Sequence, residues 1–310
     1  MPSATSDPSI TMMTVCGHPL RVRDAGPKDT EALLIVNGAA ANLEVLDSLI
    51  TLLAQSRRVI AFDQPGMGGS PATYPTLLVP TLSRMATNIL RDRGVTKADV
   101  LGYSFGGAIA QHIALTRPDL VRRQILVSSV YGTLGIPSDP ISNLVVLGHQ
   151  TPAQAMCRAY ARKAYGGVVA RDEAALDAYE KAIEAAPPDP ISFLGQAVAM
   201  SLWPVLPWLW ALRAPTLVIT GDEDHVVPLA NARLIAALLP DAHLEILPGA
   251  GHLLLMDQAA ESAALIEAFL TPGLAVATDT AGAKHRRGRG VVPLDDYRRR
   301  SDRAQAAAGC

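Results

Sequence analysis

One serine stands where this chain of 310 residues could do nucleophilic chemistry. Ser104 is the centre of residues 102–106 (GYSFG), which follow a short apolar run and precede a helical run from Gly107 to Arg117. A serine on a sharp strand-to-helix turn takes strained backbone angles, so the residues two before and two after it must be small. The turn exposes the hydroxyl and aims the positive end of the helix at developing negative charge. The pattern therefore predicts a nucleophile, although the five residues alone would also suit an ordinary glycine-rich turn.

A serine hydroxyl needs a base, and the base needs an acid to orient it. In the α/β-hydrolase fold the acid and then the histidine follow the serine in the chain, each on a loop after a later strand. His252 alone among the seven histidines follows the last expected strand in a glycine-rich loop, so it is the predicted base. Asp224, in Gly-x-x-Asp ahead of Val-Pro, is the predicted acid, and Asp222, which we expect to close the turn, is the alternative.

Two backbone N–H groups should stabilise the negative oxygen that forms when a serine attacks a carbonyl group. The N–H of Phe105 is one donor by construction of the turn. Gly38 lets the chain bend so that the N–H of Ala39 supplies the other, although Asn37-Gly38 would also fit a plain turn. The acidic residues beside His225 could also be metal ligands, but further ligands at a recognisable spacing are missing, so we predict no metal and no cofactor.

The elements around these residues predict an α/β protein with a mostly parallel, doubly wound sheet. Short, wholly apolar runs such as 33–36 are typical of strands buried on both faces, and they alternate with amphipathic helices. Residues 10–16 and 20–22 predict an antiparallel hairpin at one sheet edge. After the strand at Ile125–Val127 the strands stop and three helical regions follow, which we interpret as a lid over the carboxyl ends of the strands.

The domain prediction divides the chain into a core, a lid and a tail. Residues 10–129 and 213–272 form the α/β-hydrolase core, residues 130–212 the helical lid, and residues 273–310 a basic tail that we expect to be disordered. The lid stretch 191–212 carries three tryptophans that would line a water-poor acyl channel or a patch for a hydrophobic surface, or would simply pack the lid onto the core: Trp203, Trp208 and Trp210.

Composition narrows the class of protein further. Hydrophobic residues make up 49% of the chain and charged residues 18%, typical of a globular protein with a large core. We expect no transmembrane segment, no secretory signal, and three scattered cysteines reduced in the cytoplasm. The tail holds eight Lys or Arg residues against four acidic residues, but a solvated extension is the favoured interpretation and no nucleic-acid partner is expected.

Several of these motifs together resemble one enzyme family, the intracellular depolymerases of medium-chain polyhydroxyalkanoates. The resemblance covers residues 14–270 and is carried by LLIVNGAAANLE (33–44), VIAFDQPGMGGS (59–70), GYSFGGAIAQ (102–111), Tyr165-Gly166-Gly167, PTLVITGDEDHVVP (215–228) and Gly251-His252-Leu253. It implies a serine hydrolase of 3-hydroxyacyl esters that works at the surface of storage granules, with Ser104, Asp224 and His252 as its triad. Two features depart from the family: Phe105 stands where tryptophan is expected, and the arginine-rich tail has no counterpart.

The sequence thus predicts an ester hydrolase acting through an acyl-enzyme on Ser104, with a hydrophobic acyl ester or polyester as substrate. A small-molecule carboxylesterase or a carbon–carbon bond hydrolase of the same fold is the alternative. A non-catalytic ligand receptor is a more remote one, because a fold does not dictate function.

Overall fold

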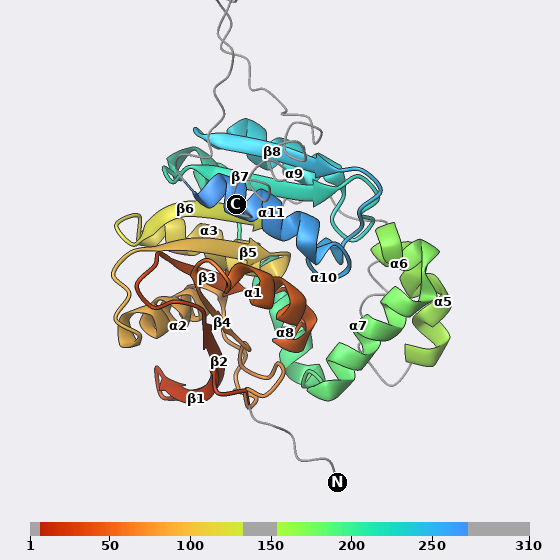
Figure 1. The fold of residues 1–310 in the computed structure, drawn as a ribbon, viewed down its shortest axis with the longest axis horizontal. Coiled ribbons are helices and arrows are strands. Elements are labelled where there is room, and N and C mark those ends of the chain that lie inside the picture. The colour runs from red at the N-terminus through yellow and green to blue at the C-terminus, as the bar shows by residue number, and fades with distance from the viewer. Residues whose placement is uncertain (1–6, 133–153, 272–310) are drawn as a thin grey trace, which may run out of the picture.

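A computed structural model describes residues 7–132 and 154–271, and it contains an eight-stranded sheet in the order β1-β2-β4-β3-β5-β6-β7-β8 (Figure 1). Strands β1 and β2 form an antiparallel hairpin, β2 also pairs antiparallel with β4, and the remaining pairs are parallel. The predicted mostly parallel sheet and its edge hairpin are confirmed. The strands are β1 (Ile10–Val15), β2 (His18–Ala25), β3 (Ala32–Val36), β4 (Arg58–Phe62), β5 (Ala98–Tyr103), β6 (Val121–Val127), β7 (Thr216–Gly221) and β8 (Ala242–Leu247).

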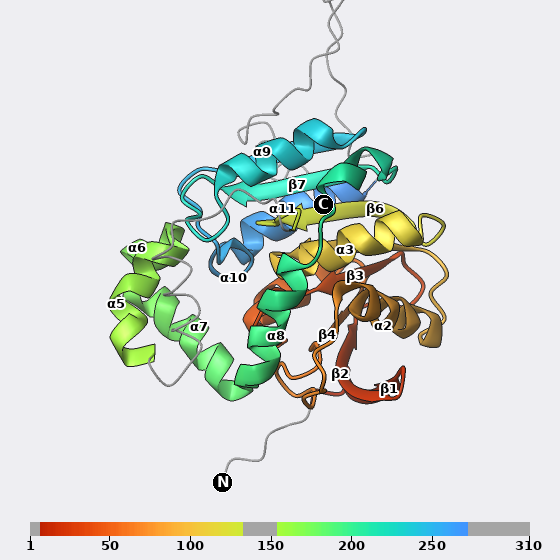
Figure 2. The same cartoon turned by 180° about the vertical axis from the view of Figure 1, so that it is seen from behind.

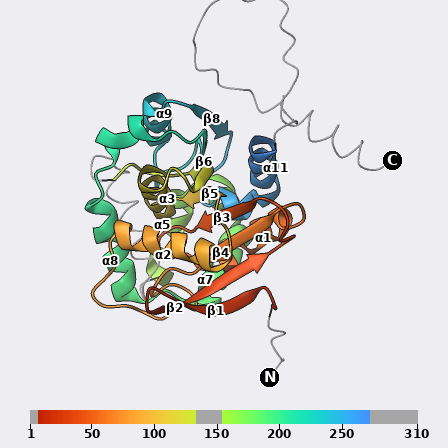
Figure 3. The same cartoon turned by 90° about the vertical axis from the view of Figure 1, so that its left-hand side faces the viewer.

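Helices cover both faces of the sheet, which is why its central strands are apolar throughout. Every residue of β3, β5 and β7 is buried. Helices α2, α3 and α9 pack on one face, and α1 and α11 pack on the other (Figures 2 and 3). The core helices are η1 (Glu44–Leu46), α1 (Asp47–Leu53), α2 (Val79–Asp92), α3 (Phe105–Thr116), α9 (Leu229–Leu238), α10 (Leu254–Asp257) and α11 (Ala259–Leu270).

A helical segment separates β6 from β7 and lies beyond the carboxyl ends of the strands (Figure 1). In its described part, residues 154–212, it consists of α5 (Gln154–Tyr165), α6 (Gly167–Arg171), α7 (Glu173–Ala185), α8 (Pro190–Ser201) and the 3₁₀ helix η2 (Leu206–Ala211). The side chains of Asp172 and Asp189 cap α7 and α8 by accepting backbone N–H bonds. The expected helix start at Thr151-Pro152 and the basic tail at 273–310 lie outside the described residues.

Two local features differ from the sequence expectation. Helix α3 begins at Phe105, two residues earlier than expected, because Ser104 itself makes the turn. Gly166-Gly167 ends α5 as expected, but the short helix α6 begins at once, and five residues are too few for a periodic pattern to be visible. None of the helices in the described ranges has the length and apolar character needed to cross a membrane.

Candidate active site

Ser104 forms the sharp turn between β5 and α3, with backbone angles of φ 51° and ψ −118°. A left-handed φ is strained for a residue with a side chain. The flanking glycines make this turn sterically accessible: a Cβ on Gly106 would lie 2.0 Å from the carbonyl oxygen of Val36, and one on Gly102 would lie 2.5 Å from that of Gly106. The small residues that the motif predicts are thus required by close backbone contact, and the serine remains half-buried at the carboxyl edge of the sheet.

The loops after β7 and β8 bring Asp224 to His252. The Asp224 Oδ2 atom lies 2.9 Å from His252 Nδ1, while Oδ1 accepts the N–H groups of Val226 at 3.0 Å and Val227 at 2.8 Å. The carboxylate is fully buried, so three hydrogen bonds compensate for the water that it has lost. Because the carboxylate is an acceptor, it places a proton on Nδ1 and leaves the Nε2 lone pair free to take a proton.

Asp222 is placed differently from Asp224. Its side chain is exposed, and Oδ1 accepts the N–H of Gly249 at 2.7 Å. Asp222 therefore joins its loop to the loop after β8, whereas the sequence analysis expected it to close its own turn, and the carboxylate at the imidazole belongs to Asp224.

Tyr103 joins the loop that carries His252 to the turn at Ser104. Its hydroxyl donates to the carbonyl oxygen of His252 at 2.7 Å, and the two rings lie 5.4 Å apart. Burial raises the pKa of Tyr103 well above its ordinary value, so its phenol stays a neutral donor. Within the described residues no hydrogen bond joins Ser104 Oγ to the imidazole, and such catalytic bonds often tighten only when substrate is bound.

The predicted oxyanion donors, the N–H groups of Ala39 and Phe105, belong to two segments that meet at Ser104. A Cβ on Gly38 would lie 3.3 Å from Ser104 Cβ, so the loop carrying Ala39 passes directly beside the serine. Phe105 occupies the first position of α3, where a backbone N–H has no acceptor within the helix. The arrangement can therefore offer two N–H groups to one oxygen near the serine.

The turn between α5 and α6 packs against the loops that carry Asp224 and His252. A Cβ on Gly166 would lie 1.8 Å from the carbonyl oxygen of Glu223, and one on Gly167 would lie 2.1 Å from the nitrogen of Gly251. The N–H of His252 also donates to the carbonyl oxygen of Tyr165 at 2.7 Å. Sequence reasoning took these glycines as a helix stop and a family resemblance, and two adjacent glycines were the only sign of close approach.

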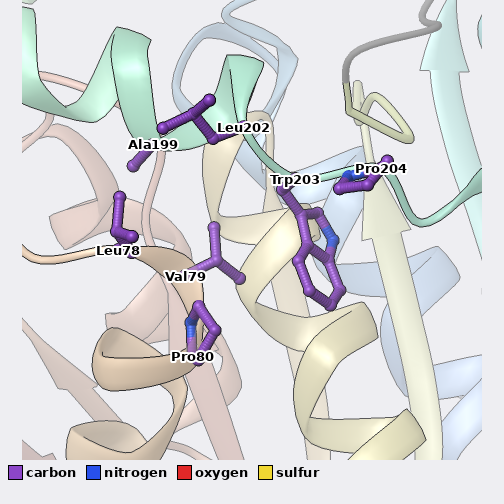
Figure 4. Close-up of a pocket in the computed structure, with 7 residues that line it drawn as sticks. All are labelled: Leu78, Val79, Pro80, Ala199, Leu202, Trp203 and Pro204. Carbon is purple, nitrogen blue, oxygen red and sulfur yellow. The ribbon is translucent and has the colours of Figure 1, made fainter.

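The three tryptophans differ in their surroundings. Trp203 stacks edge-on against His112 at 4.8 Å, while Trp208 and Trp210 on η2 are 52% and 61% exposed. Trp203 also packs against the core cluster that includes Phe105, the residue after Ser104. Trp203 helps to line a hollow of about 230 Å³ with Leu78, Val79, Pro80, Ala199, Leu202 and Pro204 (Figure 4). A role for these tryptophans in substrate binding therefore stays a prediction.

Metal ligands are not gathered at the loop after β7. Within residues 7–132 and 154–271, no group of three or more His, Cys, Asp or Glu side chains is arranged to hold a metal ion. His225, which is near the acids in sequence, is exposed.

Comparison with known proteins gives the same architecture. A poly(3-hydroxyalkanoate) depolymerase of Ectopseudomonas oleovorans is 33% identical over 239 residues, which cover 77% of this chain and 83% of that protein. A 2-hydroxymuconate semialdehyde hydrolase of Pseudomonas putida is 31% identical over 228 residues, covering 70% of this chain and 78% of that protein. A crystal structure of a hydrolase from Pseudomonas aeruginosa PA01 superimposes with a TM-score of 0.74 at 23% identity, over 85% of this chain and 99% of that one. The alpha/beta hydrolase family matches residues 33–265, and this chain belongs to that family of hydrolases.

Proposed function

We propose that this protein hydrolyses carboxylic esters through an acyl-enzyme on Ser104, with His252 as base and Asp224 as orienting acid. The observation that carries the proposal is the strained serine turn together with the buried Asp224–His252 pair, 2.9 Å apart, on the neighbouring loops. A nucleophile, a base and an orienting acid are the roles that a hydroxyl, an imidazole and a carboxylate can fill, and these are the groups of Ser104, His252 and Asp224.

The reaction follows from these positions. Ser104 Oγ attacks the ester carbonyl carbon while His252 Nε2 takes the hydroxyl proton, and the N–H groups of Ala39 and Phe105 stabilise the resulting oxyanion. The imidazolium then protonates the leaving alcohol oxygen, which breaks the ester bond and leaves an acyl-serine. A water molecule, deprotonated by the same imidazole, hydrolyses the acyl-serine and releases the carboxylic acid.

The proposed substrate class is an ester of 3-hydroxy acids, including the aliphatic polyester itself. It rests on the 33% identity to the poly(3-hydroxyalkanoate) depolymerase, which is spread over most of both chains. We propose that residues 130–212 act as the lid over the core at 10–129 and 213–272, with the tryptophans facing acyl groups or polymer. The proposal includes a cytoplasmic enzyme that works at storage granules, and it gives the tail at 273–310 no part in the chemistry.

A second candidate is hydrolysis of a carbon–carbon bond. It is favoured by relatives named 2-hydroxymuconate semialdehyde hydrolase, at 31% identity. The same serine, base and oxyanion donors would serve that reaction, so the site geometry alone supports both chemistries.

Labelling and turnover together test the proposal. A fluorophosphonate should label the wild-type chain on Ser104 and leave Ser104→Ala unlabelled, and the wild type should release 3-hydroxy acids from a suspension of medium-chain polymer. Turnover of soluble nitrophenyl esters without polymer hydrolysis would contradict the polyester substrate. Turnover of 2-hydroxymuconate semialdehyde, but not of any ester, would favour the second candidate. Absence of both labelling and turnover would overturn the enzymatic proposal.

A further inference from the structure

Two buried side-chain amides link α8 to the backbone of the loop beside Ser104, and the side-chain amide of Asn37 lies in the same loop. Gln196 on α8 donates from Nε2 to Gln64 Oε1 at 3.0 Å, and Gln64 Nε2 donates to the carbonyl oxygen of Asn37 at 2.9 Å. Gln196 Oε1 also accepts the backbone N–H of Ala40 at 3.0 Å. Each of the three amide side chains belongs to a residue less than 5% exposed: Asn37, Gln64 and Gln196.

These bonds hold the two peptide groups that flank the predicted oxyanion donor. The peptide from Asn37 to Gly38 is held on both sides, because its carbonyl accepts from Gln64 and the N–H of Gly38 donates to Asn37 Oδ1 at 2.8 Å. The N–H of the peptide from Ala39 to Ala40 is held by Gln196. The peptide between them carries the N–H of Ala39, so its direction is set by its fixed neighbours.

The backbone at Ala40 needs such support. Ala40 has a φ of 58°, and a residue with a side chain pays a steric cost in this left-handed region. A buried hydrogen bond to its N–H favours this conformation over relaxed alternatives, because turning the peptide away would leave both the N–H and Gln196 Oε1 without partners.

We propose that Gln196 is a positioning residue, which acts through Ala40 to aim the N–H of Ala39 at the oxyanion. The inference rests on the proposed function, since it gives that reaction a residue supplied by the helical segment rather than by the core. Oxyanion donors act only when they are aimed at the oxygen in advance, and a displacement of about 1 Å can cost on the order of 100-fold in rate.

The first test replaces Gln196 by leucine, which is similar in size and cannot hydrogen-bond. We expect kcat for a soluble nitrophenyl ester to fall about 10- to 100-fold in Gln196→Leu, with KM changed less than about threefold, because a transition-state contact is lost. Hydrogen–deuterium exchange at the Ala40 amide should become faster. The same change at an exposed glutamine, Gln55→Leu, should alter neither quantity and controls for the chemical change itself.

The second test uses Gln196→Glu, whose charge depends on pH. The neutral carboxyl group can accept from Ala40 and donate to Gln64 Oε1, whereas the carboxylate places a second acceptor against Gln64 Oε1. The ratio of variant to wild-type kcat should therefore be highest at low pH and fall as the pH rises through the glutamate pKa. A merely structural role would instead make the free energy of unfolding of Gln196→Glu fall with pH while kcat of the folded enzyme stays parallel to that of the wild type.

The outcomes separate this inference from the proposed function. The positioning role is wrong if the wild type hydrolyses esters while Gln196→Leu keeps the wild-type kcat and changes only in KM. It is also wrong if the ratio of Gln196→Glu to wild-type kcat does not change with pH. In both cases the proposed ester hydrolysis is unaffected. Unchanged exchange at Ala40 in Gln196→Leu would overturn the inference whatever the activity. A wild type inert toward esters and fluorophosphonate would instead overturn the proposed function.

Discussion

The sheet core and the helical segment between β6 and β7 contribute differently to the candidate site. The core supplies the side chains proposed to react, each at the carboxyl end of a strand: Ser104 after β5, Asp224 after β7 and His252 after β8. The helical segment supplies contacts to the loops on which they lie, through the carbonyl of Tyr165 and the amide of Gln196. The helical segment thus adds contacts of its own to those made within the core, such as the bond from the Tyr103 hydroxyl to the carbonyl oxygen of His252.

The two regions also differ in how completely they are buried. Strands β3, β5 and β7 have no exposed residue, whereas α8 presents Ile191 and Leu194 at 63% and 61% exposure on one side while Gln196 is buried on the other. A helix with exposed apolar residues and with Ser192 and Gln196 beside Phe193 and Ala199 on its buried side does not follow the usual pattern of a surface helix. This difference explains why the hydrophobic pattern indicated the buried strands of the sheet but not the buried contacts of Gln196 on α8.

The largest expected effect falls on the core. Asp224→Asn should lower kcat about 10⁴-fold, because an amide no longer selects the histidine tautomer whose Nε2 accepts a proton. Asp222→Asn should change kcat less than about threefold, since the amide oxygen can still accept the N–H of Gly249. Steady-state hydrolysis of a nitrophenyl ester by both variants measures the contrast. A crippled Asp222→Asn beside an active Asp224→Asn would reverse the two roles.

A smaller but specific effect is expected where the helical segment meets the base loop. In Gly167→Ala the new Cβ would approach the nitrogen of Gly251 to 2.1 Å, so the loop with His252 must move, and kcat should fall about 10- to 100-fold. Gly94→Ala is the matched control, because Gly94 also has a left-handed φ but nothing within 4 Å of the added atom. It should cost only about 1 kcal/mol of stability and leave kcat unchanged. Equal kcat values in the two variants would contradict a role for this contact.

The residues predicted to react could be found from the sequence because their chemistry limits both residue type and place. The turn at Ser104 needs glycine at 102 and 106, and the fold places an acid and a histidine after later strands. The choice of Asp224 over Asp222 rested on turn chemistry, and the structure places only Asp224 against the imidazole.

The contacts between the helical segment and the loops of the site could not be predicted from the sequence in this way. Gln196 and Gln64 are 132 residues apart, and no local pattern distinguishes a glutamine that accepts a backbone N–H from one that faces water. Such bonds depend on how the helical segment packs on the core, which hydrophobic periodicity does not determine. The short helix α6 was missed for a different reason, because five residues are too few to show a periodic pattern.

Asp257 on α10 offers a test of the core that is read in stability. Burial raises its pKa from 3.8 to about 6, an effect that outweighs the backbone hydrogen bond from Val169 and the positive charge of Arg171, which both lower it. Between pH 4 and 6 the folded state holds a proton that the unfolded state has released, so stability falls as the pH rises through this window. Asp257→Asn removes the titration and should gain about 1–2 kcal/mol relative to wild type between pH 4 and pH 8, discounted for partial exposure.

Urea unfolding of wild type and Asp257→Asn at both pH values measures this difference. The matched variant is Asp241→Asn, which changes an exposed aspartate to the same amide and should show no such relative gain. A stability difference between wild type and Asp257→Asn that is equal at both pH values would mean that Asp257 ionises normally in the folded protein.

The smallest effect is expected from the ion pair that joins the helical segment to the loops. Arg171 lies 2.5 Å from Glu223 and also donates to the carbonyl oxygen of Gly249, so one side chain contacts both the acid loop and the base loop. Both side chains of the pair are well exposed, at 55% and 40%, and exposed pairs contribute about 0.2–1 kcal/mol. Glu223→Gln should therefore change kcat less than about twofold, and Arg171→Gln somewhat more because it also loses the carbonyl of Gly249. A double-mutant cycle of Arg171→Gln and Glu223→Gln at low and high salt measures the coupling of the two side chains in kcat. If this coupling lowers kcat by a larger factor than Gly167→Ala does, charge rather than close backbone contact holds the two loops together.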